Sequence, residues 1–131
     1  WTNTGAIDNT PCKHIEIRSC LFYDGLVAPA IGNHSTYSEE SYVDQKIKIH
    51  DCKFIDITGT ASAISMQGGF DIDIYNNTFI NCTSGVRQCQ YSSYPTTVHD
   101  NRFISCTTPY PTYASAYVKA YNNMINGTFT A

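Results

Sequence analysis

The sequence has little charge, almost no leucine and no long apolar run. Charged residues make up 15% of the 131 residues, well below the usual share of about a quarter. The eight Lys and Arg residues are scattered and the formal net charge is −3, which argues against nucleic acid or an anionic membrane surface as a partner. Because no apolar run approaches the length of a membrane span, we expect no membrane insertion. With only two leucines, a leucine-rich repeat is also disfavoured.

Six cysteines and four N-glycosylation sequons are typical of an extracellular or cell-surface protein. The sequons begin at Asn33, Asn76, Asn81 and Asn126. The cysteines form neither a Cys-x-x-Cys pair nor a His-Cys cluster with metal-ligand spacing, so we expect no metal and no other cofactor. Since the sequence begins at Trp1, we expect either a processed mature protein or a piece of a longer one.

A short motif recurs five times and is the strongest signal in the sequence. Its copies span residues 15–22, 47–54, 72–79, 96–103 and 118–125. The second apolar residue of the copies is Ile17, Ile49, Ile74, Val98 and Ala120, so successive copies are 32, 25, 24 and 22 residues apart. Within each copy apolar residues occupy every second position, which predicts short strands with one buried face.

A second motif lies between these copies and opens a further apolar run. It starts with Ala6-Ile7, Ala30-Ile31, Ala63-Ile64, Gly85-Val86 and Ala116-Tyr117. Each repeat therefore holds about three short strands. Hairpin signals such as Asn-Gly are absent between the copies, which favours parallel stacking of successive repeats over a series of hairpins. We predict one all-β solenoid domain over residues 1–131.

Residues 71–82 show the pattern x-Ile-x-Ile-x-Asn-Asn-x-Phe-x-Asn-Cys, and the other copies carry variants of it. This pattern resembles the right-handed parallel β-helix superfamily of pectate lyases, polygalacturonases, phage tailspikes and surface adhesins. The resemblance covers nearly the whole chain. It implies an all-β, right-handed single-stranded parallel β-helix of about four to five coils, with about three short strands per coil. It says little about function, because this scaffold carries many unrelated activities.

Aligning the copies places residues of neighbouring coils in columns. The column at the first turn holds Cys20, Cys52, Asn77, Asn101 and Asn123, and the next inward column holds Phe22, Phe54, Phe79, Phe103 and Ile125. One outward column holds Glu16, Lys48, Asp73, Thr97 and Lys119, and the surface strip beside it holds Arg18, His50, Tyr75, His99 and Tyr121. We expect amide hydrogen bonds between coils at the turn and stacked rings in the core. The surface strip is either ordinary cross-strand pairing or a sugar-stacking or self-association face.

Four cysteines fall in pairs on adjacent coils. Cys20 and Cys52 occupy equivalent positions of adjacent coils, and so do Cys82 and Cys106, with an expected backbone spacing of about 4.8 Å within each pair. This spacing permits a disulfide in each pair, but buried free thiols would satisfy the same pattern. Cys12 and Cys89 have no obvious partner.

Catalysis is not expected, because the motifs of the β-helix polysaccharide hydrolases and lyases are absent. If the protein were an enzyme, the candidate residues would be Asp71, Asp73, Lys48, His50 and His99, which the column alignment gathers on one face. Two long excursions near residues 32–46 and 107–113 break the repeat, and loops on a rigid scaffold are either binding elements or tolerated insertions.

The repeats begin and end close to the ends of the sequence, and no amphipathic capping helix is apparent there. We therefore expect a non-catalytic extracellular structural or adhesive β-helix, which self-associates end to end into a filament or forms part of a larger surface protein. One alternative is a carbohydrate-binding or polysaccharide-degrading module, with glycans as partners. Another is the receptor-binding domain of a viral fibre.

Overall fold

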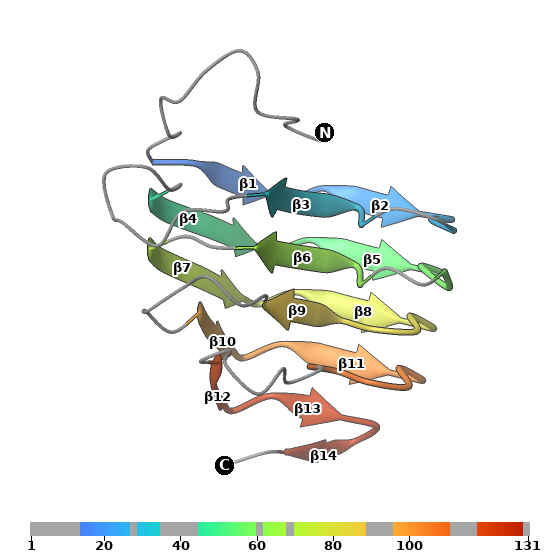
Figure 1. Ribbon diagram of the computed structural model, residues 1–131. Coiled ribbons are helices and arrows are strands. Elements are labelled where there is room, and N and C mark those ends of the chain that lie inside the picture. The colour runs from blue at the N-terminus through green and yellow to red at the C-terminus, as the bar shows by residue number, and fades with distance from the viewer. Residues whose placement is uncertain are drawn as a thin grey trace.

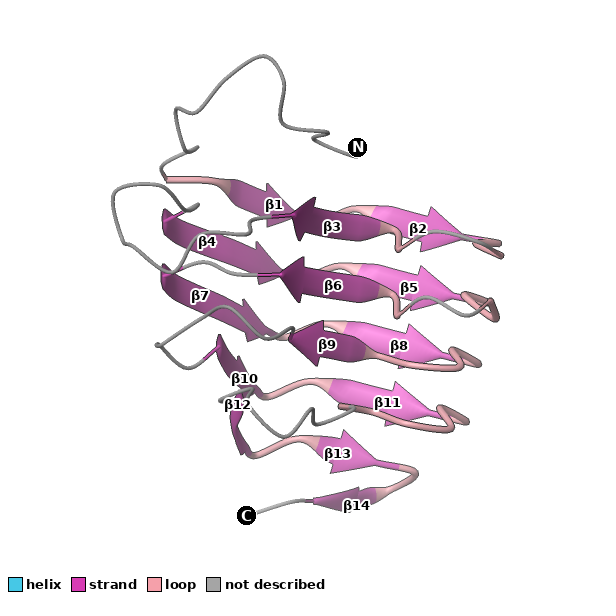
Figure 2. Cartoon of the chain, viewed as in Figure 1, coloured by secondary structure: helices cyan, strands magenta, loops and turns pink. Residues whose placement is uncertain are grey.

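The computed structural model of the chain describes residues 14–26, 29–34, 45–59, 62–67, 70–88, 96–110 and 118–129. Across these ranges the chain consists of strands and turns, without a helix (Figure 2). The first seven strands are β1 (Glu16–Arg18), β2 (Leu21–Tyr23), β3 (Ile31–His34), β4 (Gln45–His50), β5 (Lys53–Ile55), β6 (Ile64–Gln67) and β7 (Phe70–Tyr75). The others are β8 (Thr78–Ile80), β9 (Val86–Gln88), β10 (Thr96–His99), β11 (Arg102–Ile104), β12 (Val118–Tyr121), β13 (Met124–Ile125) and β14 (Thr128–Phe129).

The strands form three sheets that the chain visits in turn (Figure 1). Sheet A has the order β1-β4-β7-β10-β12, sheet B the order β2-β5-β8-β11-β13-β14, and sheet C the order β3-β6-β9. All neighbouring strands are parallel except β13 and β14. Each passage through the sheets is a coil that lies on the previous one, which confirms the prediction of an all-β fold with parallel stacking.

The strand register is the one that the repeat alignment predicts. In sheet A the paired residues run Ile17, Ile49, Ile74, Val98 and Ala120. In sheet B they run Phe22, Phe54, Phe79, Phe103 and Ile125. In sheet C they run Ile31, Ile64 and Val86, whereas Ala6-Ile7 and Ala116-Tyr117 lie outside the described residues.

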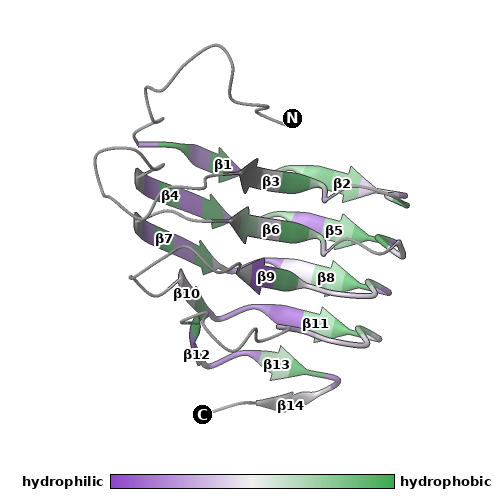
Figure 3. Cartoon of the chain, viewed as in Figure 1, coloured by the Kyte–Doolittle hydropathy of each residue, from purple (hydrophilic) through white to green (hydrophobic). Residues whose placement is uncertain are grey.

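The core is built from these columns, because every second residue of a strand points inward. Strands β4 and β7 alternate hydrophilic and hydrophobic residues along their length (Figure 3). The four Phe rings of sheet B stack in parallel, with successive centroids 4.9, 4.8 and 4.6 Å apart. The rings of Phe54, Phe79 and Phe103 are fully buried, and each contributes about 1.5–3 kcal/mol of hydrophobic stabilisation. The ring of Tyr110 packs edge-on against Phe103 at the end of the stack.

Left-handed backbone positions recur at the same places in successive coils. Their φ angles lie between +47° and +59°. They are His14, Lys46 and Asp71 before the buried part of sheet A; Ser19, Asp51, Asn76, Asp100 and Asn122 between sheets A and B; and Asp24, Asp56, Asn81, Ser105 and Asn126 directly after β2, β5, β8, β11 and β13. Most are Asn, Asp or Ser, whose short polar side chains suit turns and, for Asn and Asp, tolerate this conformation. Identical turns keep the sheets of neighbouring coils in register.

The two expected excursions are described only in part. Gly32 belongs to β3 and Lys46 to β4, whereas residues 35–44 lie outside the described residues. In the second excursion Thr108 forms a parallel bridge with Ser84, and the carbonyl of Pro109 accepts a hydrogen bond from the Val86 N–H at 2.9 Å. Residues 111–113 lie outside the described residues. The described ends of both segments therefore continue the stacking of the coils.

A hairpin ends the parallel stacking of sheet B. Strand β14 pairs antiparallel with β13, and the connecting residues Asn126 and Gly127 have φ angles of +47° and +89°. Positive φ at both central residues is typical of a type I′ turn, for which Asn-Gly is a preferred sequence. The repeat alignment does not predict this hairpin, because it follows the last copy and occurs once. Strand β14 occupies the edge of β13 on which a further parallel strand would pair.

Candidate functional site on the outer face of sheet A

Four rings of the surface strip form one continuous stack on the outer face of sheet A. The His50 and Tyr75 centroids lie 4.7 Å apart, Tyr75 and His99 5.3 Å apart, and His99 and Tyr121 4.9 Å apart, with interplanar angles of 10° or less. Register pairing puts Arg18 next to His50 in the strip. Both faces of the Tyr75 and His99 rings are covered by neighbouring rings, so a sugar cannot stack on either of them.

Each histidine of the strip lies between two carboxylates, an arrangement that we call a histidine clamp. In the first clamp His50 Nε2 is 2.9 Å from Glu16 Oε1, and His50 Nδ1 is 2.7 Å from Asp51 Oδ2. Glu16 belongs to the preceding coil, and Asp51 occupies the left-handed turn directly after β4. His50 is buried although both carboxylates are exposed. The clamp therefore ties two coils together through one ring.

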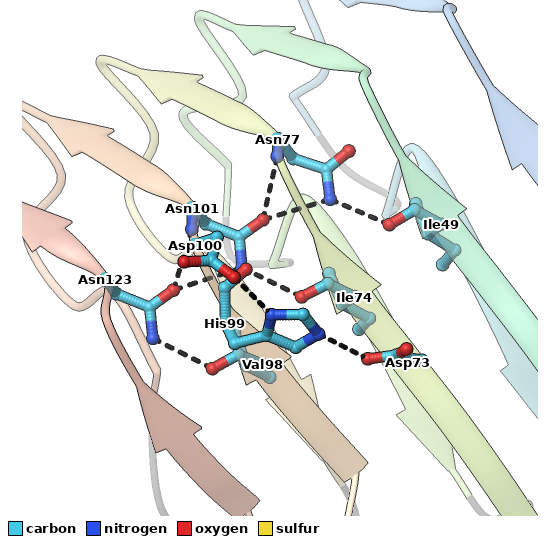
Figure 4. A network of polar contacts seen from close by, with 9 residues as sticks. All are labelled: Ile49, Asp73, Ile74, Asn77, Val98, His99, Asp100, Asn101 and Asn123. Atoms are coloured by element: carbon cyan, nitrogen blue, oxygen red, sulfur yellow. Dashed lines mark hydrogen bonds and ion pairs between the residues drawn. The ribbon is translucent and has the colours of Figure 1, made fainter.

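The second clamp repeats this geometry two coils later (Figure 4). His99 Nε2 is 3.0 Å from Asp73 Oδ1, and His99 Nδ1 is 2.6 Å from Asp100 Oδ2. An ionised carboxylate only accepts hydrogen bonds, so both ring nitrogens must carry a proton for both bonds to form. Carboxylates of the same face therefore occupy both ring nitrogens of His99.

The first clamp shifts the pKa values of His50 and Glu16 in opposite directions. Hydrogen bonds to Asp51 and Glu16 raise the pKa of His50 above its ordinary value of 6.5. The hydrogen bond from His50 lowers the pKa of Glu16 below its ordinary value of 4.5. The contribution of Glu16 to stability is thus lost as the pH falls through its folded pKa, and that of His50 is lost as the pH rises through its folded pKa. Both contributions are complete between pH 4.5 and 6.5.

A buried ladder of asparagines lies beneath the strip, where the chain turns from sheet A to sheet B (Figure 4). Asn101 Oδ1 accepts hydrogen bonds from the Asn77 N–H at 2.9 Å and from Asn77 Nδ2 at 3.0 Å. Asn123 Oδ1 accepts the equivalent bonds from Asn101 at 3.0 and 3.1 Å. Each Nδ2 also donates to a carbonyl of the preceding coil, those of Ile49, Ile74 and Val98. This confirms the amide hydrogen bonds between coils that the column alignment predicts.

All four described cysteines, Cys20, Cys52, Cys82 and Cys106, are free thiols, so the structure contains neither of the two possible disulfides among them. The thiols donate hydrogen bonds to backbone carbonyls: Cys20 Sγ to Arg18 at 3.2 Å, and Cys52 Sγ to His50 at 3.2 Å. Cys52 also donates to Ile17 on the preceding coil at 3.7 Å, as an asparagine of the ladder would.

The four thiols differ in exposure. Cys20 is exposed, whereas Cys52, Cys82 and Cys106 are buried, and burial raises the pKa of Cys52. A hydrogen bond between Cys82 and Cys106 raises the pKa of Cys82 and lowers that of Cys106. Cys12 and Cys89 lie outside the described residues.

The asparagines of the sequons have structural roles in the turns. Asn76, Asn81 and Asn126 all occupy left-handed positions where other coils carry Asp or Ser. Asn81 Nδ2 donates to Asp56 Oδ1 at 2.6 Å, and Asn126 Oδ1 accepts from the Ser105 N–H at 2.9 Å. The backbone conformation therefore explains these asparagines without glycosylation. Asn33 lies in β3, and glycosylation at all four positions stays a prediction.

Three of the five candidate catalytic residues meet in one hollow. Its volume is about 450 Å³, and its lining consists of Asp71, Ile72, Asp73, Thr97, His99, Lys119 and Tyr121. Asp71 and Asp73 share one face of β7, as their spacing predicts, although Asp71 has a φ of +57°. Lys48 and His50, on β4, do not line the hollow. The structure thus separates the five candidates into two groups.

The carboxylate partners of the histidines are the part of the site that sequence reasoning missed. Asp51 and Asp100 directly follow their histidines, and Glu16 contacts His50 diagonally across β1 and β4. A signal for the clamps exists in the sequence: His-Asp at 50–51 and 99–100 alternates with Tyr-Asn at 75–76 and 121–122. The alternation has a period of two coils, so comparison of adjacent copies conceals it.

Comparison of the chain with protein-family models, curated proteins and solved structures found no match. The described part of the chain has no helix of sufficient length and apolarity to cross a membrane. Nor do its described His, Cys, Asp and Glu side chains form a group of three or more that could hold a metal ion. The geometry of the outer face is therefore the feature of the described residues that bears on function.

Proposed function

We propose that the chain is a right-handed single-stranded parallel β-helix that serves as an extracellular structural or adhesive module. The repeating order of the three sheets and the in-register columns support this architecture. The sequons and the resemblance to extracellular β-helix proteins support the location. The proposed partners are further copies of the chain or other coils of a larger surface protein.

The histidine clamps and the ring stack are the observation that carries the structural role. These side chains are the ones most suited to catalysis or ligand binding, yet the histidine nitrogens and the stacked ring faces contact other residues of the same face. His50 and His99 each use both nitrogens in bonds to carboxylates. Such contacts join neighbouring coils and leave no free imidazole nitrogen, which fits a scaffold better than an acid–base catalyst.

The hairpin at β14 restricts how copies of the chain could stack. At that end, sheet A ends on β12, whereas β14 covers the edge of sheet B. Head-to-tail stacking of copies could therefore extend sheet A. It could not extend sheet B by direct parallel pairing, because β14 occupies the edge that the next strand would need. Of the two forms of the proposal, the module of a larger surface protein fits this restriction better than the filament subunit.

Assays for activity and for assembly test the proposal separately. We expect the purified chain to release no reducing sugars or unsaturated products from plant, algal and bacterial polysaccharides. Turnover that Asp73→Asn abolishes would overturn the non-catalytic role. Electron microscopy and sedimentation velocity over a range of concentrations test assembly: rods that lengthen with concentration would support the filament form, and discrete monomers throughout would retire it.

The hollow between β7 and β12 favours carbohydrate binding as a second candidate function. It is polar and open on the surface, and it combines carboxylates, an amine and hydroxyls. Neutral sugars are recognised by such mixtures of donors and acceptors, since each sugar hydroxyl both donates and accepts. A glycan array in which no glycan binds the wild-type chain would remove this second function and leave the structural role intact.

A further inference from the structure

The hollow on sheet A arises from the side chains of one outward column. This column runs Glu16, Lys48, Asp73, Thr97 and Lys119 along the successive coils. Thr97 is its only uncharged member and the shortest side chain among them. It lies between Asp73 and Lys119, both of which line the same hollow. The short threonine leaves a gap in an otherwise continuous row of long or charged side chains.

The two walls of this gap carry opposite charges. Asp71 and Asp73 stand on the β7 side, and Lys119 stands on the β12 side. Asp73 Oδ1 bonds to His99 Nε2, so its second oxygen remains available to a ligand. A ligand ion of either sign would therefore face one wall of like charge. A neutral ligand rich in hydroxyls can donate to the carboxylates of one wall and accept from the ammonium of the other.

Ligand length follows from the strand spacing. Asp73 and Lys119 lie on strands separated by one intervening strand, so their backbones are about 9.6 Å apart. A ligand of two linked sugar rings can extend across all three strands and contact both walls at once. A hollow of about 450 Å³ has room for a ligand of that size.

We propose that the hollow lined by Asp71, Asp73, Thr97, Lys119 and Tyr121 binds a neutral oligosaccharide at least two sugar units long. Hydroxyls of the sugar donate to the carboxylates of β7 and accept from the Lys119 ammonium and the Thr97 and Tyr121 hydroxyls. This inference rests on the second function proposed above and gives that function a site and a ligand class.

Hydrogen bonds must supply most of the affinity at this site. His99 covers one face of the Tyr121 ring, and the Lys119 ammonium lies 5.8 Å from the same ring centroid. Stacking of a sugar is therefore restricted to what remains of this one ring. An open, hydrogen-bonded site without extensive stacking gives dissociation constants of about 1 mM, or about −4 kcal/mol.

Two-dimensional NMR of the ¹⁵N-labelled chain detects binding of this strength. The probes are maltose, cellobiose, mannobiose and N,N′-diacetylchitobiose, each titrated to about 10 mM. At least one disaccharide is expected to shift the amide signals of residues 97 and 119, with smaller shifts on β1 and β4. The corresponding monosaccharides are expected to shift the same signals at least about tenfold less at equal concentration.

Thr97→Lys tests the origin of the hollow. A lysine at this position fills the gap and places an ammonium beside Asp73, as Lys48 does on the other side of Asp73. Because Lys already occurs on two strands of this column, the substitution suits the exposed face. We expect affinity to fall by at least about tenfold. Lys119→Met removes the donor of the opposite wall and is expected to weaken binding in the same direction.

Lys48→Met is the matched control, since it removes an ammonium of the same column that does not line the hollow. Unchanged binding in Lys48→Met with loss in Thr97→Lys supports the site. Equal binding in wild type and Thr97→Lys overturns it. If sugars shift only amide signals elsewhere on the chain, carbohydrate binding stands as a function but this site is refuted. If no sugar shifts any amide signal, both the site and the carbohydrate-binding function are refuted.

Discussion

The asparagine ladder and the histidine clamps both join neighbouring coils, but they do so in opposite environments. Ladder residues Asn77, Asn101 and Asn123 are at most 1% exposed and carry no charge. Three of the four carboxylates of the clamps are exposed and the fourth, Asp73, is half-buried, as is the His99 ring, whereas the His50 ring is buried. The ladder therefore depends on hydrogen bonds that water cannot replace, whereas water and salt screen the clamps.

This difference predicts a permanent and a conditional connection between coils. An unpaired amide or carbonyl in the core costs free energy at every pH, because neither group titrates near neutrality. A clamp with both bonds formed requires a protonated ring and ionised carboxylates. We expect the ladder to set the overall stability of the fold and the first clamp, at His50, to contribute to its dependence on pH.

The largest effect is expected from breaking the ladder at its centre. Asn101→Ala removes the acceptor of the Asn77 backbone N–H, one of the two acceptors of Asn77 Nδ2, and the Nδ2 that donates to the Ile74 carbonyl. We expect the free energy of unfolding to fall by about 3–5 kcal/mol, measured by urea denaturation. The exposed neighbour Arg102→Ala serves as the control. A loss below about 1 kcal/mol in Asn101→Ala would show that the ladder is not a major source of stability.

A smaller and pH-dependent effect is expected from the first clamp. His50→Phe keeps an aromatic ring against Tyr75 but removes both bonds to carboxylates. Since the pKa of His50 is raised, its contribution is complete below pH 6.5 and is lost as the pH rises through the folded pKa. Stability of the wild type should therefore decline more than that of His50→Phe between about pH 5.5 and about pH 8.5.

Urea midpoints at the two pH values provide the measurement. Tyr75→Phe is the control, because it alters the same ring stack without touching a clamp. It should retain the wild-type pH dependence. Parallel curves for wild type and His50→Phe would mean that the clamp makes no titratable contribution to folding.

The smallest effect is expected from extending the ladder by one coil. In Cys52→Asn the new Nδ2 can donate to the Ile17 carbonyl, which now accepts from the Cys52 thiol at 3.7 Å. The new amide oxygen can also accept the N–H of Cys20, a bond that a thiol forms poorly. We expect a gain of about 1 kcal/mol in unfolding free energy. Cys20→Asn, at an exposed position, should change stability little; a loss in Cys52→Asn would show that the coil spacing there does not admit an amide.

The sequence predicts the sheets better than it predicts the site. Phe54, Phe79 and Phe103 stack because period-two alternation and a recurring motif define both the inward face and the register. These are local patterns that repeat in each coil. The surface strip follows from the same register, so its residues could be named from the alignment alone.

What could not be predicted depends on single turns and diagonal contacts. Asp51 reaches His50 because the turn after β4 is left-handed. Glu16 reaches the same ring although the residue paired with His50 is Arg18, two positions later on β1. Column alignment compares only residues directly opposite each other, so it misses both. The β14 hairpin arises from a single Asn126-Gly127 turn that no other coil repeats.

The alternation of rings in the stack sets the unit by which such a chain can lengthen or shorten. His50 and His99 never meet, because Tyr75 separates them and Tyr121 follows. Deleting the single coil from β7 to β9 would lay the His50 ring directly on the His99 ring and remove Asp73, the carboxylate that joins His99 to the preceding coil. Removing two coils would restore a histidine against a tyrosine. Duplications and deletions that keep the alternation of histidine and tyrosine on this face must therefore come in pairs of coils.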